Sequence, residues 1–312
     1  MVEMDIVYTW VDDTWPGYAQ MLGAYAEDGH DRNPNRTRDN LDLLKYSLRS
    51  LERHCPWAGR IHLVTAAPQV PRWLNPQSVR LVHHDKIIPA EYLPTFSSFT
   101  IVSCLYRIEG LSERFLYVED DMLFGTGVMP EDFVTGDGRL RLFPRLGHTA
   151  APADRDRADI SPWNAALARC NFLLDAAFSP RRRNGINHVP LLIQKHWWAE
   201  MTGRWPEDFA RTRASRFRKA GTIAPEYLYP WFLLHTGRAV LEPLAHTYRD
   251  SAYAPLENTP FTTALALLRA RLFPPKMLAL NDGFGPNPRP AVVKAARRFL
   301  ETSYPLKSRF EL

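Results

Sequence analysis

Short apolar runs recur along the first part of the chain and predict the strands of a sheet. Each run is rich in β-branched and aromatic residues, which is typical of buried strands. The predicted strands are Met4–Trp10, Ile61–Thr65, Val79–His83 and Phe115–Val118. Because stretches with helical patterns separate them, we expect right-handed crossovers and a mostly parallel sheet.

The clearest helical pattern is in Leu41–His54, where leucines recur at the spacing of one helix face. Asp39 precedes this stretch as a candidate N-cap, and Pro56 follows it as a terminator. A second helix is expected over Thr100–Gly110. Further along, the pattern becomes mainly helical, and the predicted helices are roughly 162–178, 190–203, 225–236, 260–272 and 290–303.

A turn and a polar connection divide these two regions. The sequence Gly136-Asp137-Gly138 predicts a hairpin turn that returns through Leu140–Phe143, and residues 144–161 have little apolar content. We therefore expect an α/β core over residues 1–145 and a mainly helical part over residues 146–312, which together form one catalytic unit.

Three acidic residues interrupt the apolar pattern at the end of the fourth predicted strand. Glu119, Asp120 and Asp121 follow Phe115–Val118 directly, before apolar character resumes. Ligands of open α/β sheets bind beyond the carboxyl ends of the strands, and carboxylates there are natural ligands of a hard divalent cation. A solvated turn is the alternative, and for an isolated acidic pair it is the favoured one.

Composition narrows the functional classes. With 312 residues and 45% hydrophobic content, the chain is long enough to bury a full core. The formal net charge is only +5, and no continuous basic face with interleaved aromatics is present, which argues against nucleic-acid binding. The three cysteines are widely spaced and form neither a disulfide framework nor a metal knuckle, so we expect a reducing compartment.

No apolar stretch reaches the roughly 20 residues needed to span a bilayer. The N-terminus also lacks a cationic segment followed by an apolar one, the pattern of a signal peptide. We expect an unprocessed cytoplasmic protein, and peripheral contact with a membrane face stays open.

Four blocks, in order along almost the whole chain, carry a family resemblance. They are Asp5-Ile-Val-Tyr-Thr-Trp-Val-Asp12; Arg38-Asp-Asn through Tyr117–Gly125; Asn187-His-Val-Pro190 with Ser215-Arg-Phe-Arg218; and Leu280-Asn-Asp282 with Tyr304-Pro-Leu-Lys-Ser308. Together they resemble the Stealth family of sugar-1-phosphate transferases. That family includes bacterial capsule polymerases and the lysosomal-enzyme GlcNAc-1-phosphotransferase.

The resemblance implies a GT-A-like, Rossmann-like α/β fold whose mainly helical C-terminal half completes the site. It also implies transfer of a hexose 1-phosphate from a nucleotide sugar to a saccharide hydroxyl, in capsular or cell-surface polysaccharide synthesis. The implied donor is a UDP-hexose or UDP-N-acetylhexosamine such as UDP-GlcNAc, and the implied cofactor is Mg²⁺ or Mn²⁺. The resemblance further implies a bacterial protein in which residues 1–145 bind the donor.

The family motifs also suggest roles for single residues. His188, Asp121 and Arg218 are the predicted catalytic residues, because an imidazole exchanges protons near neutral pH and a guanidinium matches phosphate oxygens. Whether His188 or Asp121 is the base stays open. The predicted metal ligands are Asp120, Asp121 and Asp282. The predicted donor-binding residues are Thr9, Trp10, Val11, Asp12, Arg38, Asp39, Asn281 and Arg216.

Several of these residues have ordinary structural alternatives. Asp12 and Asp39 also suit helix caps, and Trp10 also suits a core. Without the resemblance, a simple turn is the favoured interpretation of Asn281-Asp282-Gly283. A solvated helix end is about as good an explanation for Arg216 as phosphate binding.

Four positions depart from the family pattern. Glu119 stands where the family usually has Asn, and Ser97, Phe99 and Val102 stand where it often has Asn, His and Glu. These positions lie near the donor sugar or acceptor in the family pattern, so the substrate is less defined than the reaction type. Two alternatives remain: an ordinary glycosyltransferase that releases UDP, and a non-catalytic protein that binds sugar nucleotides or polysaccharide.

Overall fold

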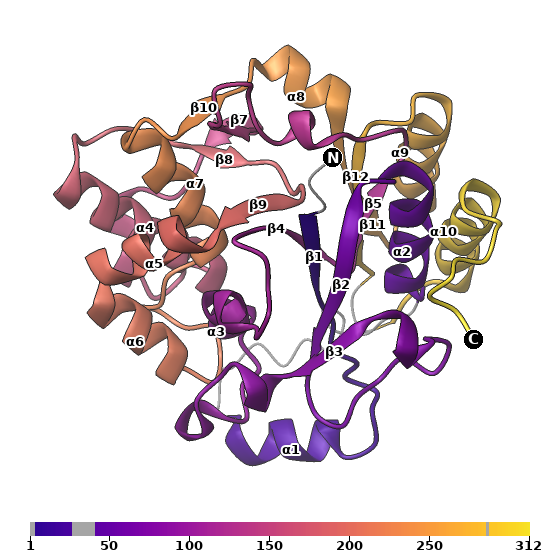
Figure 1. The fold of residues 1–312 in the computed structure, drawn as a ribbon, viewed down its shortest axis with the longest axis horizontal. Helices are drawn as coiled ribbons and strands as arrows, with labels where there is room; N and C mark the ends of the chain where they lie inside the picture. The colour runs from indigo at the N-terminus through magenta and orange to yellow at the C-terminus, as the bar shows by residue number, and fades with distance from the viewer. Residues whose placement is uncertain (1–3, 27–40, 285–286) are drawn as a thin grey trace.

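The computed structural model describes residues 4–26, 41–284 and 287–312. Its centre is a five-stranded sheet in the order β3-β2-β1-β4-β9 (Figure 1). The strands are β1 (Met4–Thr9), β2 (Ala58–Thr65), β3 (Arg80–His83), β4 (Arg114–Glu119) and β9 (Leu191–Gln194). The first four run parallel and β9 runs antiparallel to β4. The predicted α/β fold with a mostly parallel sheet is confirmed.

The strand order places the ends of β1 and β4 side by side. The chain moves outward from β1 to β2 and β3, then adds β4 on the other side of β1. Open α/β sheets bind ligands where the strand order reverses in this way, beyond the carboxyl ends. Thr9 pairs with Glu119, so the acidic residues after β4 lie next to the segment that follows β1.

Helix α2 (Leu43–His54) packs with its leucines in the core, but it begins later than predicted. Asp42 has a left-handed backbone, with φ of 53°, and its side chain makes no capping bond. A left-handed residue cannot continue a right-handed helix, so Leu41 stays outside it although its side chain is buried. The predicted cap, Asp39, lies outside the described residues.

A second sheet, which the sequence did not predict, adjoins the acidic segment. Its order is β11-β12-β5, formed by β11 (Ser251–Glu257), β12 (Met277–Gly283) and β5 (Met122–Phe124). The Leu280 amide donates to the Asp121 carbonyl at 2.9 Å. This bond ties the late strand β12 to the residues that follow β4.

The remaining helices lie mainly in the second half of the chain. They are α3 (Ser98–Cys104), α4 (Pro162–Ala177), α5 (Lys195–Arg204), α6 (Pro206–Ala214), α7 (Pro225–His235), α9 (Pro260–Leu272) and α10 (Pro290–Ser303). The prediction of a helix over 190–203 is wrong at its start, where Leu191–Gln194 forms β9. A short apolar run by itself is compatible with a strand or a helix, and this one forms a strand because it pairs with β4.

Short elements complete the fold. They are α1 (Tyr18–Tyr25), α8 (Leu244–Asp250), β6 (Leu140–Leu142), β7 (Pro144–His148), β8 (Asn184–Ile186), β10 (Ala239–Leu241) and the 3₁₀ turns Pro76–Ser78, His84–Lys86, Ala90–Tyr92, Leu105–Arg107, Pro130–Asp132 and Pro152–Asp156. The turn predicted at 136–138 forms, but the two segments that it connects pair only through one antiparallel bridge, between Val134 and Leu140. The strand β6 pairs instead with β10, in the parallel direction.

Two apolar clusters hold the molecule together. The larger joins the central sheet to α4 and α7, and the smaller packs α9 and α10 on the sheet of β5, β11 and β12. In Figure 1 these two helices lie on the side of the molecule opposite α4 to α7. No helix within the three described ranges is long and apolar enough to cross a membrane.

Candidate active site

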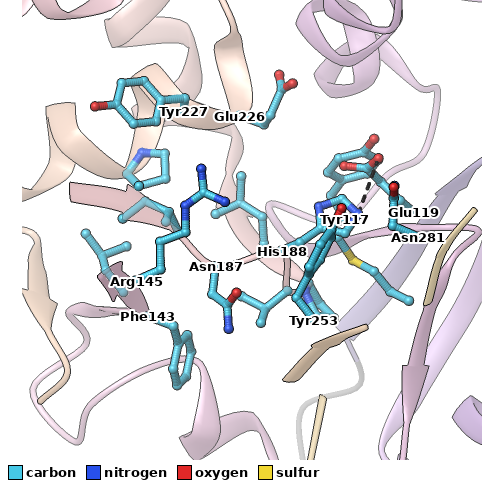
Figure 2. Close-up of a pocket in the computed structure, with 18 of the residues that line it drawn as sticks. Tyr117, Glu119, Phe143, Arg145, Asn187, His188, Glu226, Tyr227, Tyr253 and Asn281 are labelled. Carbon is cyan, nitrogen blue, oxygen red and sulfur yellow. Dashed lines mark ion pairs between the residues drawn. The ribbon is translucent and has the colours of Figure 1, made fainter. Parts of the chain in front are cut away.

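A cavity of about 800 Å³ opens beyond the carboxyl end of β4. Its walls come from both sheets, from α4 and α7, and from the segment between β8 and β9. Figure 2 labels lining residues from several of these walls, among them Glu119, His188 and Glu226. The polar lining includes Glu119, Asp120, Asp121, His188, Arg145, Arg218, Glu226 and Asn281, and the aromatic lining includes Tyr117, Phe143, Trp163, Tyr227 and Tyr253. The volume is within the range of pockets that enclose small ligands.

His188 and Asp121 form the central contact of this cavity. The Nε2 atom of His188 lies 3.0 Å from Asp121 Oδ1 and 3.9 Å from Glu119 Oε2. Burial disfavours the charged imidazole, but the two carboxylates outweigh it and raise the pKa of His188 to about 10. Burial also raises the pKa of Glu119, and the charge of Asp121 adds to this shift. The charge of His188 in turn partly offsets the rise at Glu119.

The same three side chains are the candidate metal site of the described residues. Ligand atoms of Glu119, Asp121 and His188 lie within 4.8 Å of one another. Glu119 ends β4, and Asp120 and Asp121 form the turn between β4 and β5. The turn brings the Asp121 carboxylate to Glu119, and Asp120 lines the cavity wall. The predicted set of Asp120, Asp121 and Asp282 thus differs from this trio. The side chain of Asp282 is outside the described part.

Two carboxylates and one imidazole suit a divalent cation. Carboxylate oxygens are preferred by Mg²⁺ and Mn²⁺, and an imidazole is tolerated better by Mn²⁺. Burial is the main reason that the pKa of Glu119 is raised, and repulsion by the Asp121 carboxylate adds to it. A cation placed between them would relieve that repulsion, so the residues present fit the predicted cofactor.

Arg218 reaches the cavity from the segment before α7. It donates to the hydroxyl of Ser98, and its guanidinium lies 4.8 Å from the ring centre of Phe99 and 5.8 Å from that of Trp163. Phe99 is fully buried. The residue that departs from the family pattern therefore supports the guanidinium instead of facing the cavity.

Asn281 reaches the same cavity from β12, more than 150 positions after the acidic cluster. Tyr253 approaches from the neighbouring strand β11, and its ring meets the edge of His188 with 6.2 Å between ring centres. The structure thus brings His188, Asp120, Asp121, Arg218 and Asn281 around one hollow, as Figure 2 shows for His188 and Asn281.

The residues at the end of β1 do not line this cavity. The hydroxyl of Thr9 shares a hydrogen bond with that of Tyr117, and Trp10 is buried in the core. The Asp12 carboxylate accepts hydrogen bonds from the amide and hydroxyl of Thr14, at 2.8 and 2.6 Å, and so caps a turn. Val11 is partly buried between them.

The other predicted donor ligands are also away from the hollow or undescribed. Arg216 packs its guanidinium 4.8 Å from the ring centre of Tyr25 and donates to the carbonyl of Leu93 at 3.3 Å. Arg38 and Asp39 lie outside the described residues. The predicted roles of these residues in donor binding stay predictions.

Two family models match the chain. They are Stealth protein CR2, conserved region 2, over residues 36–142, and Stealth protein CR3, conserved region 3, over residues 187–235, and together they cover half of the chain. The first contains the acidic cluster after β4, and the second contains His188 and Arg218.

The chain belongs to the Stealth family.

Curated relatives agree with this assignment. Exopolysaccharide phosphotransferase SCO6023 of Streptomyces coelicolor is 35% identical over 99% of this chain and 52% of its own length. Exopolysaccharide phosphotransferase CpsY of Mycobacterium tuberculosis is 33% identical over 99% of this chain and 58% of its own length. The chain therefore spans about half the length of the curated Stealth relatives it matches.

A weaker likeness was found among solved structures. The galactosyltransferase LgtC, solved with donor and acceptor sugar analogs, is 15% identical, with 98% of this chain and 97% of that chain covered and a TM-score of 0.46.

Two polar groups of this cavity were not predicted from the sequence of this Stealth protein. Glu226 lies on the cavity wall in the first turn of α7, where a Glu after Pro225 reads as an ordinary helix start. Burial raises its pKa to about 7, and its Oε2 atom has no hydrogen-bond partner among the described residues. Arg145 projects into the hollow from β7 (Figure 2). Its side chain passes over Gly185, where a Cβ would lie 2.2 Å from Arg145 Nε.

Proposed function

We propose that this chain transfers a sugar 1-phosphate from a nucleotide sugar to a saccharide hydroxyl during exopolysaccharide synthesis. One observation carries the proposal: the carboxylates of Glu119 and Asp121 cluster with His188 in a cavity that Arg218 also lines. The relatives named exopolysaccharide phosphotransferases match 99% of the chain, which supports the same reaction class.

In the proposed reaction the acceptor oxygen attacks the phosphorus that carries the sugar. A new bond forms between that oxygen and phosphorus, and the bond from phosphorus to the bridging oxygen breaks. The nucleoside monophosphate leaves with the bridging oxygen and its electron pair, and the acceptor hydroxyl gives up its proton.

Asp121 and His188 lie 3.0 Å apart, and either could take up that proton. The imidazole would do so only in its neutral form, which the carboxylates beside it disfavour. Arg218 would bind nonbridging phosphate oxygens, for which a planar guanidinium is well suited. Its stacking on Phe99 and its bond to Ser98 restrict its orientation.

Glu119 and Asp121 would hold the divalent cation, for which Mg²⁺ and Mn²⁺ are the candidates. His188 would join them as a ligand only if it is not the base, because its Nε2 atom cannot bind a cation and a proton at once. When bound, the cation supplies positive charge beside the diphosphate. The identity of the metal, a UDP-linked donor, the capsular acceptor and a cytoplasmic location belong to this proposal. Three free, buried cysteines are in keeping with a reducing compartment.

We also propose that residues 1–145 and 146–312 act as one catalytic unit. The cavity is lined by Glu119 from the first part and by His188, Arg218 and Asn281 from the second. A single apolar cluster joins β1 and β4 to α4 and α7.

Product analysis tests the proposed reaction. Purified protein is incubated with a UDP-sugar, Mn²⁺ and a saccharide acceptor, and the nucleotide product is separated by ion-exchange chromatography. We expect UMP, with turnover reduced by about a hundredfold or more in Asp121→Asn and in His188→Ala. His196→Ala is the matched control, because His196 also pairs with a carboxylate, Glu113, but on the exposed surface.

Two outcomes would contradict the proposal. Release of UDP in place of UMP would show ordinary glycosyl transfer, in which the bond between sugar and phosphate is broken. The second outcome is that both variants still bind the donor and that the unmodified protein shows no turnover with any acceptor. This would indicate a non-catalytic binding protein.

A further inference from the structure

Helix α9 carries a row of large apolar side chains that point away from the molecule. Phe261, Leu265, Leu268 and Leu272 are 77%, 56%, 51% and 61% exposed. Their spacing of four, three and four residues places them on one face of the helix. Exposed rows of this kind mark surfaces that contact a partner or a membrane.

The exposed row is not the face by which α9 packs on the core. The opposite face of α9, with Thr263, Leu267 and Ala270, is already buried in the smaller apolar cluster. Figure 1 shows α9 next to α10 at the edge of the molecule. The helix therefore has two apolar faces, and within the described part of the chain only one of them is covered.

The charges around the row identify the kind of surface that it fits. Helix α9 contains no Asp or Glu, and its charged residues are Arg269 and Arg271. At 100° per residue these two arginines fall on opposite sides of the apolar row. An apolar face flanked by cationic side chains is typical of helices that lie in the interface of an anionic bilayer.

A second feature lies where α9 ends. A hollow of about 230 Å³ is lined by Arg53, His54 and Arg271 together with residues of α10, and none of the described residues that line it is acidic. Phe273, which follows α9, is 75% exposed. Arg271 both flanks the apolar row and lines this hollow, so a lipid phosphate bound by Arg271 and Arg53 would lie at the cationic edge of the row.

We propose that α9 docks this protein on an anionic membrane surface, with its apolar row among the acyl chains and with Arg53 and Arg271 on lipid phosphates. The sheet of β5, β11 and β12 separates α9 from the cavity, because Leu278 and Leu280 face α9 and α10 while Asn281 faces the cavity. Docking therefore leaves the cavity accessible. This inference does not depend on the proposed reaction.

Vesicle flotation with the full chain tests the docking surface. Vesicles of phosphatidylcholine with phosphatidylglycerol should bind the protein about tenfold better than phosphatidylcholine alone, and added salt should weaken the binding. Combining Leu265→Asn with Leu272→Asn should reduce binding to anionic vesicles by about tenfold or more. Combining Arg53→Gln with Arg271→Gln should remove most of the dependence on salt.

Two controls separate the surface from general effects of polarity and charge. Leu306→Asn changes a leucine that is 76% exposed outside α9, and Arg182→Gln removes an exposed arginine elsewhere. Both should bind vesicles like the unmodified protein, and circular dichroism should show that every variant is folded.

Any of three results would overturn the proposal. The first is that the unmodified protein does not bind anionic vesicles, and the second is that the α9 leucine variant binds them as well as the Leu306→Asn control. The third is that light scattering shows a dimer for the unmodified protein and a monomer for the leucine variant while both bind vesicles equally, which would mean that the row joins two copies of the chain.

Discussion

The guanidinium of Arg218 lies 4.8 Å from the centre of the Phe99 ring, which is fully buried beneath it. The family resemblance predicts His at position 99, and Phe99 gives the guanidinium an apolar, aromatic support there. A cation over an aromatic face is stabilised by the ring quadrupole, more so when water is excluded. Arg218 is also bound by Ser98, so its orientation is fixed before a ligand arrives.

Phe99→Leu should weaken donor binding because it removes the aromatic support of Arg218. We expect the KM for the UDP-sugar to rise by about threefold to tenfold with kcat less affected, measured by initial rates. Phe209→Leu is the matched control, since Phe209 is equally buried under an arginine, Arg213, away from the cavity. Both variants should lose about 1–2 kcal/mol of unfolding free energy. An equal rise of KM in both would contradict the prediction.

Glu119→Gln should weaken divalent metal binding because it removes one of two carboxylates in the cluster with His188. We expect the Kd for Mn²⁺ to rise by about tenfold to a hundredfold, measured by electron paramagnetic resonance without substrate. Asp120→Asn, a neighbouring carboxylate on the same cavity wall, should have a smaller effect. A larger effect of Asp120→Asn would instead favour the ligand set predicted from the sequence.

Donor affinity should depend on pH through Glu226. Burial and the charge of Glu119 raise the pKa of Glu226 to about 7, so this side chain is neutral below pH 7 and negative above it. A negative charge on the wall opposes an anionic diphosphate. We expect the KM for the donor to rise by about threefold to tenfold between pH 6 and pH 8.5.

Glu226→Gln should flatten this profile, because the amide keeps the shape of the neutral acid and does not ionise. Glu113→Gln, at an exposed carboxylate outside the cavity, should leave the profile unchanged. If Glu226→Gln kept the full rise in KM, the group that titrates would be a different one.

Asp5 should contribute to acid sensitivity of the fold. Burial would raise its pKa, but hydrogen bonds from Arg60 and the Ser112 amide outweigh it and lower the pKa to about 2. The stabilisation is complete above the unfolded pKa of 3.8 and is lost as pH falls through about 2. Because Arg60 is partly exposed, the loss is at most about 2 kcal/mol.

Urea unfolding at pH 7, 4 and 2 measures this contribution. Asp5→Asn should destabilise the protein at pH 7 and show a shallower decline between pH 4 and pH 2 than the unmodified chain. Asp137→Asn, at an exposed turn residue, should keep the original slope. Parallel declines in Asp5→Asn and the unmodified protein would rule out this role of Asp5.

Predictions from the sequence were correct where a pattern is compatible with only one kind of element. The apolar run that ends in Glu119-Asp120-Asp121 predicted a buried strand with its acids at the carboxyl end, and β4 has that form. Such predictions were weakest for short apolar runs such as Leu191–Gln194 and Met277–Leu280, which became strands because a partner strand was available. Local preference does not determine such pairing.

The sequence by itself determined the α/β class, the family and the residue types that carry the chemistry, because periodicity, strand-end acids and short motifs are local properties of the chain. Only the tertiary structure decided which of these residues meet. It grouped Glu119 with Asp121 and His188, left Trp10 in the core, and brought Glu226 to the cavity wall. Those outcomes depend on strand order and on contacts between distant segments, which no local pattern encodes.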